Sequence, residues 1–167
     1  SGQGAYVDGP HAAFSGGAGL LSTAQDYARF VQMLLNGGEL EGVRLLSPTT
    51  VALMTSNHVG TLYQNGALGW GLGFEVVEQR GRAPRYGAAG EFSWSGAYHT
   101  TYWADPAERL AVVFLSQLLP AGTTNLTGRV RTLVNQAIVG PPTGAAPPTT
   151  SSTARPAATR ASRPGGR

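Results

Sequence analysis

The chain of 167 residues contains no cysteine and no lysine. Without cysteine it can form neither a disulfide nor a thiolate metal site, and this absence is compatible with the cytoplasm, the periplasm or secretion. All twelve basic residues are arginine, so no catalytic motif that needs a lysine can lie within this chain. No apolar run approaches the roughly 20 residues that a helix needs to cross a bilayer, so we predict no membrane span.

Positive charge is concentrated at the C-terminus. The formal net charge is +3, and four of the arginines stand at positions 155, 160, 163 and 167. Before residue 140 eight arginines face nine acidic residues, so this part is close to neutral and we expect no nucleic-acid partner. Residues 141–167 are proline, alanine, threonine, serine, glycine and arginine, which predicts a disordered tail behind a domain over residues 1–140. An alternative role for the tail is a spacer or a tether to an anionic surface.

Two longer segments have the apolar spacing of amphipathic helices. In the first, Ser22 is the predicted cap, Gln25 completes a capping box, and apolar side chains recur on one face over residues 27–35. In the second, Asn125 is the predicted cap of a helix near the end of the domain. The inner side of that helix is expected to consist of Leu126, Val130, Leu133, Val134, Ala137 and Ile138.

A shorter helix is predicted from residue 47, where Ser-Pro supplies a cap residue followed by proline at the first helical position. It should end near Asn57. Residues 39–46 are expected to form a turn or a hairpin-like link between this helix and the one before it.

Strands are predicted between the short helix and the last one. Residues 70–77 alternate bulky with small or polar side chains, which is typical of a single strand with one buried face. Residues 92–96 lead into 98–104, and after an Asp-Pro turn residues 110–115 are apolar on both faces, as in a central strand. Short links between strands favour an antiparallel β-sheet with helices packed on it, an α+β fold.

Several short motifs follow one another along the chain. They are Gly-Gly-Ala-Gly-Leu-Leu-Ser-Thr at 16–23, Asp-Tyr-Ala-Arg-Phe at 26–30, Leu-Leu-Ser-Pro at 45–48, Gly-Trp-Gly-Leu-Gly-Phe at 69–74, and Trp94-Ser95-Gly96 ahead of a strand that ends in Asp-Pro at 105–106. In this order and spacing they resemble the C-terminal half of the serine β-lactamase and penicillin-binding-protein superfamily. The most similar branch is that of the class C β-lactamase-like esterases. The resemblance covers about residues 2–139 and implies a partial β-lactamase/transpeptidase-like fold.

In that superfamily a serine nucleophile lies in a Ser-x-x-Lys motif, and the lysine and the tyrosine of a Tyr-x-Asn motif move protons. Such an assembly is needed because a neutral serine hydroxyl is a poor nucleophile until a base takes its proton. The absence of lysine excludes Ser-x-x-Lys here. Tyr63-Gln64-Asn65 matches the letters of Tyr-x-Asn, but it follows the short helix instead of preceding residues 16–21, so we interpret the match as accidental. The resemblance thus places both motifs upstream of Ser1 and predicts that this chain is inactive alone.

Trp94-Ser95-Gly96 matches the third motif of the superfamily, which is Lys- or His-x-Gly in most members and often Trp-x-Gly in the esterases. The resemblance implies that these three residues line the substrate cleft. It also implies that the backbone N–H of Ala97 is one of two oxyanion-hole donors, and removing such a donor typically lowers the rate about 100-fold to 1,000-fold. Gly96 would suit a backbone that approaches a ligand closely. The alternative is a plain strand with an aromatic side chain on its packed face.

Trp94 also bears on the substrate. A lysine in this motif would attract a substrate carboxylate, and an indole cannot. The expected partner of the complete protein is a small-molecule ester, amide or β-lactam, with an ester or amide that lacks the carboxylate favoured. Arg82 and Arg85 could replace the missing cation, but we expect them to be solvated at the surface. No cofactor is expected.

Other catalytic arrangements have little support. His11, His58 and His99 lie far apart and no Gly-x-Ser-x-Gly elbow accompanies them, so a triad with Asp26 or Asp105 is not predicted. The same spacing argues against a metal site. His99 follows the Trp-Ser-Gly triplet and is expected to face the cleft or the solvent.

Two functional classes therefore stay open. In the first, the chain is part of a serine hydrolase that forms an acyl-enzyme on a serine supplied upstream. In the second, it is a noncatalytic remnant or ligand-binding module of the same fold. An upstream segment with Ser-x-x-Lys and then Tyr-x-Asn would favour the first class, and a segment without them would favour the second. The sequence predicts neither an oligomeric state nor a compartment.

Overall fold

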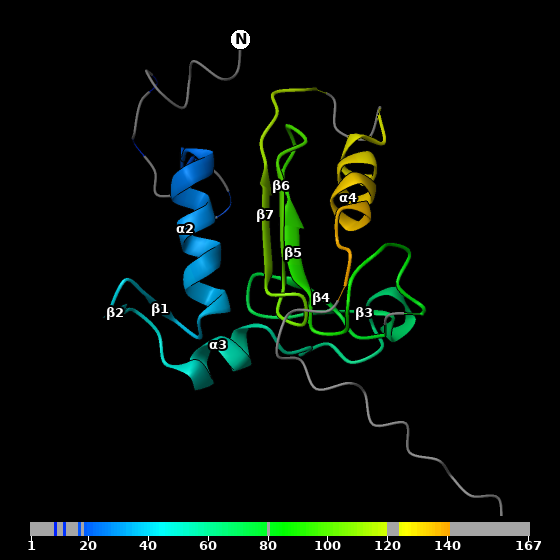
Figure 1. The fold of residues 1–167 in the computed structure, drawn as a ribbon, viewed down its shortest axis with the longest axis horizontal. Helices are drawn as coiled ribbons and strands as arrows, with labels where there is room; N and C mark the ends of the chain where they lie inside the picture. The colour runs from blue at the N-terminus through cyan, green and yellow to red at the C-terminus, as the bar shows by residue number, and fades with distance from the viewer. Residues whose placement is uncertain are drawn as a thin grey trace, which may run out of the picture.

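The computed structural model describes residues 19–79, 81–119 and 124–140, together with Gly9, Ala12 and Gly17. Its elements are α2 (Ala24–Leu35), β1 (Glu39–Leu40), β2 (Val43–Arg44), α3 (Pro48–Met54), η1 (Gln64–Gly66), β3 (Leu68–Trp70), β4 (Glu75–Val77), β5 (Phe92–Ser95), β6 (Thr101–Asp105), β7 (Leu110–Phe114) and α4 (Leu126–Gln136). Strands β3 to β7 form an antiparallel sheet in chain order, with α2 on one face and α4 on the other (Figure 1). The predicted α+β arrangement is therefore confirmed. The predicted disordered tail, residues 141–167, lies outside the described residues.

Helix α2 begins one residue later than the sequence predicts. Thr23 has the extended backbone of a cap residue (φ −90°, ψ 160°), and its hydroxyl oxygen accepts a hydrogen bond from the Asp26 backbone N–H at 3.1 Å. The same hydroxyl donates to the Asp26 carboxylate at 2.8 Å. Ser22 donates to the carbonyl of Thr23 instead. The capping box predicted from Ser22 and Gln25 is therefore wrong, and Thr23 with Asp26 stabilises this end.

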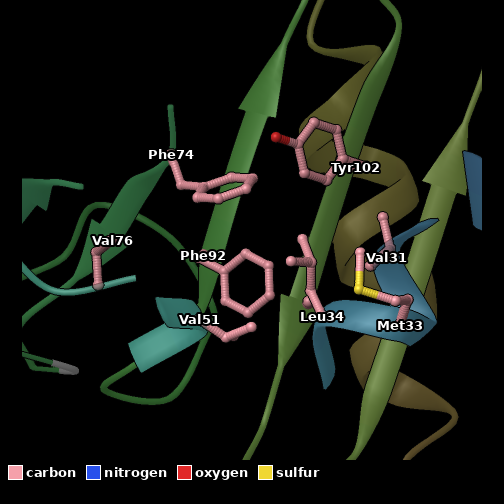
Figure 2. Close-up of a cluster of buried hydrophobic side chains, with 9 residues drawn as sticks. Val31, Met33, Leu34, Val51, Phe74, Val76, Phe92 and Tyr102 are labelled. Atoms are coloured by element: carbon pink, nitrogen blue, oxygen red, sulfur yellow. The ribbon is translucent and has the colours of Figure 1, made fainter. Parts of the chain in front are cut away.

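The apolar face of α2 packs on the sheet and forms the core. Val31 and Leu34 are buried on this helix and face Phe92 and Tyr102 of the two middle strands (Figure 2). The ring of Phe74 lies 5.2 Å from that of Phe92, centroid to centroid, at an edge-to-face angle of 62°. Because alternate residues of a strand share one face, Phe92 of β5 and Tyr102 and Ala104 of β6 contribute to this layer. The periodicity seen in the sequence thus has a direct structural cause.

The link and the short helix after α2 agree with their predictions. Strands β1 and β2 pair antiparallel as a small hairpin. Ser47 caps α3, since its hydroxyl oxygen accepts a hydrogen bond from the Thr50 backbone N–H at 3.0 Å. The helix ends at Met54, earlier than the predicted end near Asn57, and the Asn57 side chain binds the following loop instead by accepting a hydrogen bond from the Val59 N–H at 2.9 Å.

Residues 70–77 form the end of one strand, a turn and a second strand, so the prediction of a single strand is wrong. The Gly71 N–H donates to the Phe74 carbonyl at 2.7 Å, which closes a tight turn. Gly73 has φ +94°, a conformation that glycine adopts at little cost. Leu72 lies at the tip and is 51% exposed. The alternating pattern was misleading because it continues through the turn without interruption.

Strand β7 lies at the edge of the described sheet, although its apolar sequence predicted a central strand. Its residues are half-buried throughout. Ala111 and Val113 pack against the core under α2, while the register places Val112 beside Trp103 on the opposite face. Since helices cover both faces of this sheet, a strand at its edge can also be apolar on both sides.

Helix α4 buries a face that agrees only in part with the predicted one. Four of the six predicted inner residues are half-buried, namely Leu126, Val130, Val134 and Ile138. Asn125 stands at the cap position, but its side chain makes no capping hydrogen bond. Leu133, assigned to the inner side from the sequence, is 66% exposed, and the buried residue of this helix is Arg131. The apolar pattern of α4 therefore predicted part of its inner side, but it missed Arg131 and wrongly included Leu133. No helix among the described residues is both long enough and apolar enough to span a membrane.

Candidate active site

Strands β5 and β6 are joined by a tight three-residue loop, Ala97-Tyr98-His99. The Gly96 N–H donates to the Thr100 carbonyl at 2.8 Å, and the His99 N–H donates to the Gly96 carbonyl at 3.1 Å. His99 has φ +61° in the position where such loops need a left-handed residue. This geometry fixes where the triplet Trp94-Ser95-Gly96 ends and where the next backbone N–H points.

Beyond Ser93 the edge of β5 is not paired with β4. The ladder between the two strands ends at the pair Glu75 and Ser93, so the later residues of β5 have no partner on β4. The Gly96 N–H points the other way, toward β6. Ala97 is exposed, and its N–H donates no hydrogen bond to any residue in the part of the chain that the structure describes. The end of β5 thus presents an unpaired donor at an open edge.

The presence of glycine at position 96 can be explained by the hairpin itself, without an approach to a ligand. A Cβ at this position would lie 2.5 Å from the Thr100 hydroxyl oxygen, across the hairpin. The close pairing of β5 with β6 therefore accounts for a glycine here without any bound molecule.

Trp94 stands beside this open edge with its ring partly in solvent. It is 46% exposed, and its ring centroid lies 4.5 Å from that of Trp70 in an edge-to-face contact of 68°. The register places Trp94 with Tyr102 on the face under α2, and Trp70 with Glu75 on the face under α4. The two indoles meet around the edge, beyond the first residue of β4. The alternative interpretation of the sequence, a plain strand, required Trp94 to pack into the core. Trp94 is not packed there.

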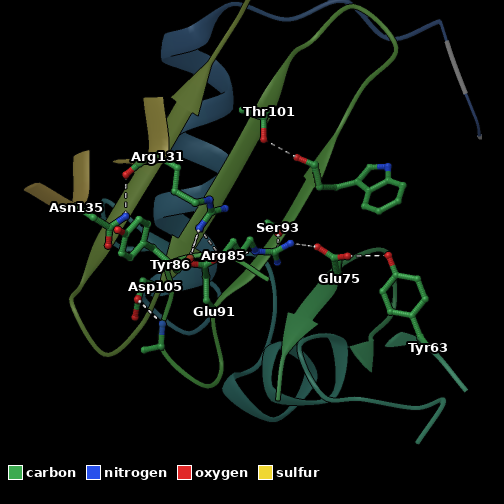
Figure 3. A network of polar contacts seen from close by, with 12 residues as sticks. Tyr63, Glu75, Arg85, Tyr86, Glu91, Ser93, Thr101, Asp105, Arg131 and Asn135 are labelled. Atoms are coloured by element: carbon green, nitrogen blue, oxygen red, sulfur yellow. Dashed lines mark hydrogen bonds and ion pairs between the residues drawn. The ribbon is translucent and has the colours of Figure 1, made fainter. Parts of the chain in front are cut away.

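Tyr63, the residue that matched Tyr-x-Asn by its letters, has a defined structural partner. Its hydroxyl donates to the Glu75 carboxylate at 2.7 Å (Figure 3). The bond to this carboxylate, together with burial, raises the pKa of Tyr63 above its ordinary value. A phenol held protonated in this way is a poor base, which agrees with the interpretation of the match as accidental.

A chain of charged side chains crosses the face of the sheet under α4. The Arg131 guanidinium donates to both carboxylate oxygens of Glu91 at 2.7 and 2.8 Å, and it lies 4.2 Å from the ring centre of Trp103. Glu91 is 1% exposed. Burial raises the pKa of Glu91, and the nearby Arg131 acts against this shift by stabilising the carboxylate.

Arg85 extends the chain of charges toward Tyr63. It forms an ion pair with Glu75, donates to the Ser93 hydroxyl at 3.1 Å, and lies 3.5 Å from a Glu91 oxygen (Figure 3). The prediction that Arg85 is solvated at the surface is therefore wrong, whereas Arg82 is exposed. Two acidic residues beside apolar strand residues, position 75 in β4 and position 91 directly before β5, were the sequence signal for a buried basic partner.

The two histidines that the structure describes, His58 and His99, each lie against a backbone carbonyl. His99 is buried, and its ring nitrogen Nδ1 lies 3.0 Å from the Leu118 carbonyl oxygen, so the expectation that it faces the cleft or solvent is wrong. His58 is exposed with its Nε2 atom 2.8 Å from the Leu53 carbonyl oxygen. His11 lies outside the described residues.

The two aspartates considered for a triad are bound elsewhere. The Asp26 carboxylate accepts from the Thr23 hydroxyl at the start of α2. The buried Asp105 carboxylate accepts from the backbone N–H groups of Ala88, Ala107 and Glu108 and stabilises two turns. Among the described residues, no group of three histidine, cysteine or acidic side chains could hold a metal ion.

Comparisons with known proteins agree with the motif order. Residues 2–136 match the Beta-lactamase family. The protein Rv1367c of Mycobacterium tuberculosis is 41% identical over 117 residues, which cover 62% of this chain and 29% of that protein. A protein of Escherichia coli O157:H7, provisionally named a D-alanyl-D-alanine carboxypeptidase, is 32% identical over 108 residues, which cover 61% of this chain and 23% of that protein.

A solved structure has the same fold. EstCE1, a hydrolase with promiscuous acyltransferase activity, superposes with a TM-score of 0.59 at 31% identity, over 68% of this chain and 29% of that chain. The chain thus spans less than a third of the length of each of these proteins. Because the family match extends over most of the sequence, the chain belongs to the Beta-lactamase family, within the serine β-lactamase and penicillin-binding-protein superfamily.

Proposed function

We propose that this chain is the C-terminal part of a serine hydrolase of the esterase type, over residues 1–140, followed by a disordered tail over residues 141–167. In the complete protein, an upstream segment supplies the Ser-x-x-Lys nucleophile and the Tyr-x-Asn motif. The chain supplies one wall of the active site and one oxyanion donor. Alone it is inactive, because it has no lysine to activate a serine.

The observation that carries this proposal is the unpaired backbone N–H of Ala97 at the open end of β5. An oxyanion hole needs an N–H that is fixed in direction and not already bonded, so that it stabilises the charge that develops on the carbonyl oxygen. The tight loop between β5 and β6 fixes this direction, because Gly96 and His99 bond each other across it. Ser95 and Gly96, directly before Ala97, would lie against the substrate.

The substrate class follows from the charges around this edge. Trp94 stands where most of the superfamily has a cation, and the nearby Arg85 is bound to Glu75 and Glu91. Neither residue can attract a free carboxylate on the substrate. We therefore propose an uncharged small-molecule ester or amide as the substrate, in preference to a β-lactam. Cofactors have no role in this mechanism, since the serine, its base and the oxyanion donors suffice for acyl transfer.

A serine-reactive fluorophosphonate tests the proposal. The intact mass of the 167-residue polypeptide and of an upstream-extended form is measured after incubation with the reagent. We expect an adduct on the extended form and none on the 167-residue polypeptide. Labelling of the 167 residues themselves would overturn the division of the active site, and an extended form that stays unlabelled and lacks Ser-x-x-Lys would favour a noncatalytic ligand-binding module.

A further inference from the structure

Three aromatic rings form a continuous row at the open edge of the sheet. The ring of Tyr63 lies 5.8 Å from that of Trp70, and Trp70 lies 4.5 Å from Trp94, centroid to centroid. Tyr63 and Trp70 are half-buried, whereas nearly half of Trp94 is exposed. The row therefore presents aromatic surface next to the Ala97 N–H while its inner end is held by the protein.

The backbone of Trp70 is fixed by the loop that follows α3. The Trp70 N–H donates to the Asn57 side-chain oxygen at 3.3 Å, and the Trp70 carbonyl accepts from the His58 N–H at 2.9 Å. A Cβ at position 69 would lie 2.3 Å from the Asn57 side chain, so only glycine allows this approach. Trp70 is thus held at its backbone, and its ring contacts Tyr63 at a tilt of 41° and Trp94 edge to face.

The inner end of the row is connected to the buried charges. The Tyr63 hydroxyl donates to Glu75, Glu75 pairs with Arg85, and Arg85 donates to the Ser93 hydroxyl on β5. Ser93 is the residue directly before Trp94. The hydrogen-bonded chain therefore returns to the strand that carries the exposed indole, so that the two ends of the aromatic row are held relative to each other.

We propose that Trp70 and Trp94 determine substrate specificity by binding an uncharged apolar group next to the scissile carbonyl, and that Tyr63, Glu75 and Arg85 are positioning residues for Trp70. This inference rests on the proposed function, since it assigns a binding surface to the same site. Its physical basis is that partly exposed indole faces gain free energy when apolar surface covers them. Arg85, which is connected to the row through Glu75, is already paired with carboxylates and adds no affinity for charged groups.

The complete protein is assayed with two series of uncharged esters. p-Nitrophenyl acetate, butanoate and hexanoate lengthen the acyl side, and ethyl, butyl and hexyl acetate lengthen the alcohol side. On the side that contacts the indoles, we expect kcat/KM to rise about twofold per methylene, roughly half the effect of full burial. Trp70→Ala should abolish this rise, so that the three esters of that series react with nearly equal kcat/KM.

Two further variants separate positioning from folding. Tyr63→Phe keeps the ring and removes the hydrogen bond to Glu75, so the rise with chain length should weaken through KM, at unchanged kcat. Trp70→Phe should restore part of the rise that Trp70→Ala removes. Tyr86→Ala is the matched control, because Tyr86 is an exposed aromatic residue outside the row, and it should keep the full wild-type rise. Near-ultraviolet circular dichroism checks that each variant is folded.

A wild-type rise that survives in Trp70→Ala on both ester series would overturn the specificity assignment. An unchanged chain-length dependence in Tyr63→Phe would overturn the positioning role alone. If the complete protein is neither labelled by fluorophosphonate nor active on any ester, the proposed function fails.

The aromatic surface is then tested by a binding experiment. Quenching of tryptophan fluorescence by the neutral p-nitrobutyranilide is compared with quenching by the charged p-nitrosuccinanilate. Preference for the neutral probe, lost in Trp70→Ala, supports the binding surface, and equal affinity overturns it.

Discussion

The two faces of the sheet are built from different chemistry. Under α2 the contacts are apolar, with Val31 and Leu34 packed against the aromatic rings of β5 and β6. Under α4 the sheet carries buried carboxylates that pair with arginines, and Arg131 of α4 contacts Glu91 and the ring of Trp103 on β6. An apolar layer tolerates small shifts because its forces have little directionality, whereas a buried ion pair depends on both partners being in place.

Removal of Arg131 should have the largest effect on stability. Arg131→Met leaves Glu91 buried without its main partner, and breaking a buried pair in this way costs about 3–5 kcal/mol. Urea unfolding followed by tryptophan fluorescence measures the change. The double variant Arg131→Met with Glu91→Leu removes both charges and should recover most of the loss. If the double variant is as unstable as Arg131→Met, the cost arises from packing and the contrast between the faces is wrong.

Truncation on the apolar face should cost somewhat less. Leu34→Ala removes a buried side chain from the layer between α2 and the sheet and should lower the free energy of unfolding by about 3 kcal/mol, within the usual range for such changes. Leu133→Ala on the exposed side of α4 is the matched control and should change stability by less than about 0.5 kcal/mol. Equal losses at the two positions would mean that Leu133 is buried, as the sequence predicted, and not exposed.

The apolar face was largely predictable from the sequence, and the charged face was not. The spacing over residues 27–35 predicted α2 and most of its buried side, because a helix repeats every 3.6 residues and apolar side chains gather on one face. Phe30, predicted on that face, is 39% exposed, and the buried Met33 was not predicted. Inward acidic residues such as Glu91 indicate a basic partner somewhere, but nothing local in the sequence shows that it is Arg131, 40 positions away. Long-range pairing of this kind is set by the tertiary fold.

The candidate site shows the same division. The triplet Trp94-Ser95-Gly96 could be found from its letters and its place before a strand. The contact of Trp94 with Trp70 and the hydrogen bond from Tyr63 to Glu75 could not, because the turn at Leu72 was not recognised and the two strands were read as one. The sequence sign of that turn was Gly73, a glycine inside an alternating pattern, and its φ is positive in the structure.

Titration of Glu91 should make the charged face sensitive to pH. Burial raises the pKa of Glu91 in the folded protein above its value in the unfolded chain, about 4.3. The folded state then binds the proton more tightly, so the contribution of Glu91 to stability is greatest below that pH and declines as the pH rises through the folded-state pKa. The difference in free energy of unfolding between the wild type and Glu91→Gln should decline as the pH rises from the unfolded-state to the folded-state pKa of Glu91. The same difference, measured with Arg131→Met present in both proteins, should decline more steeply. A relative stability that rises with pH there would show that Arg131 outweighs burial.

The smallest expected effect lies at the start of α2. Thr23→Ala removes the hydroxyl that accepts from the Asp26 N–H and should lower the free energy of unfolding by about 1 kcal/mol. Ser22→Ala is the matched control, since Ser22 donates only to an adjacent carbonyl among the described residues, and its loss should be close to zero. Both variants are measured by urea unfolding under the same conditions. The reverse order of effects would place the cap at Ser22 with Gln25, and α2 would then begin one residue earlier, where the sequence alone predicted it.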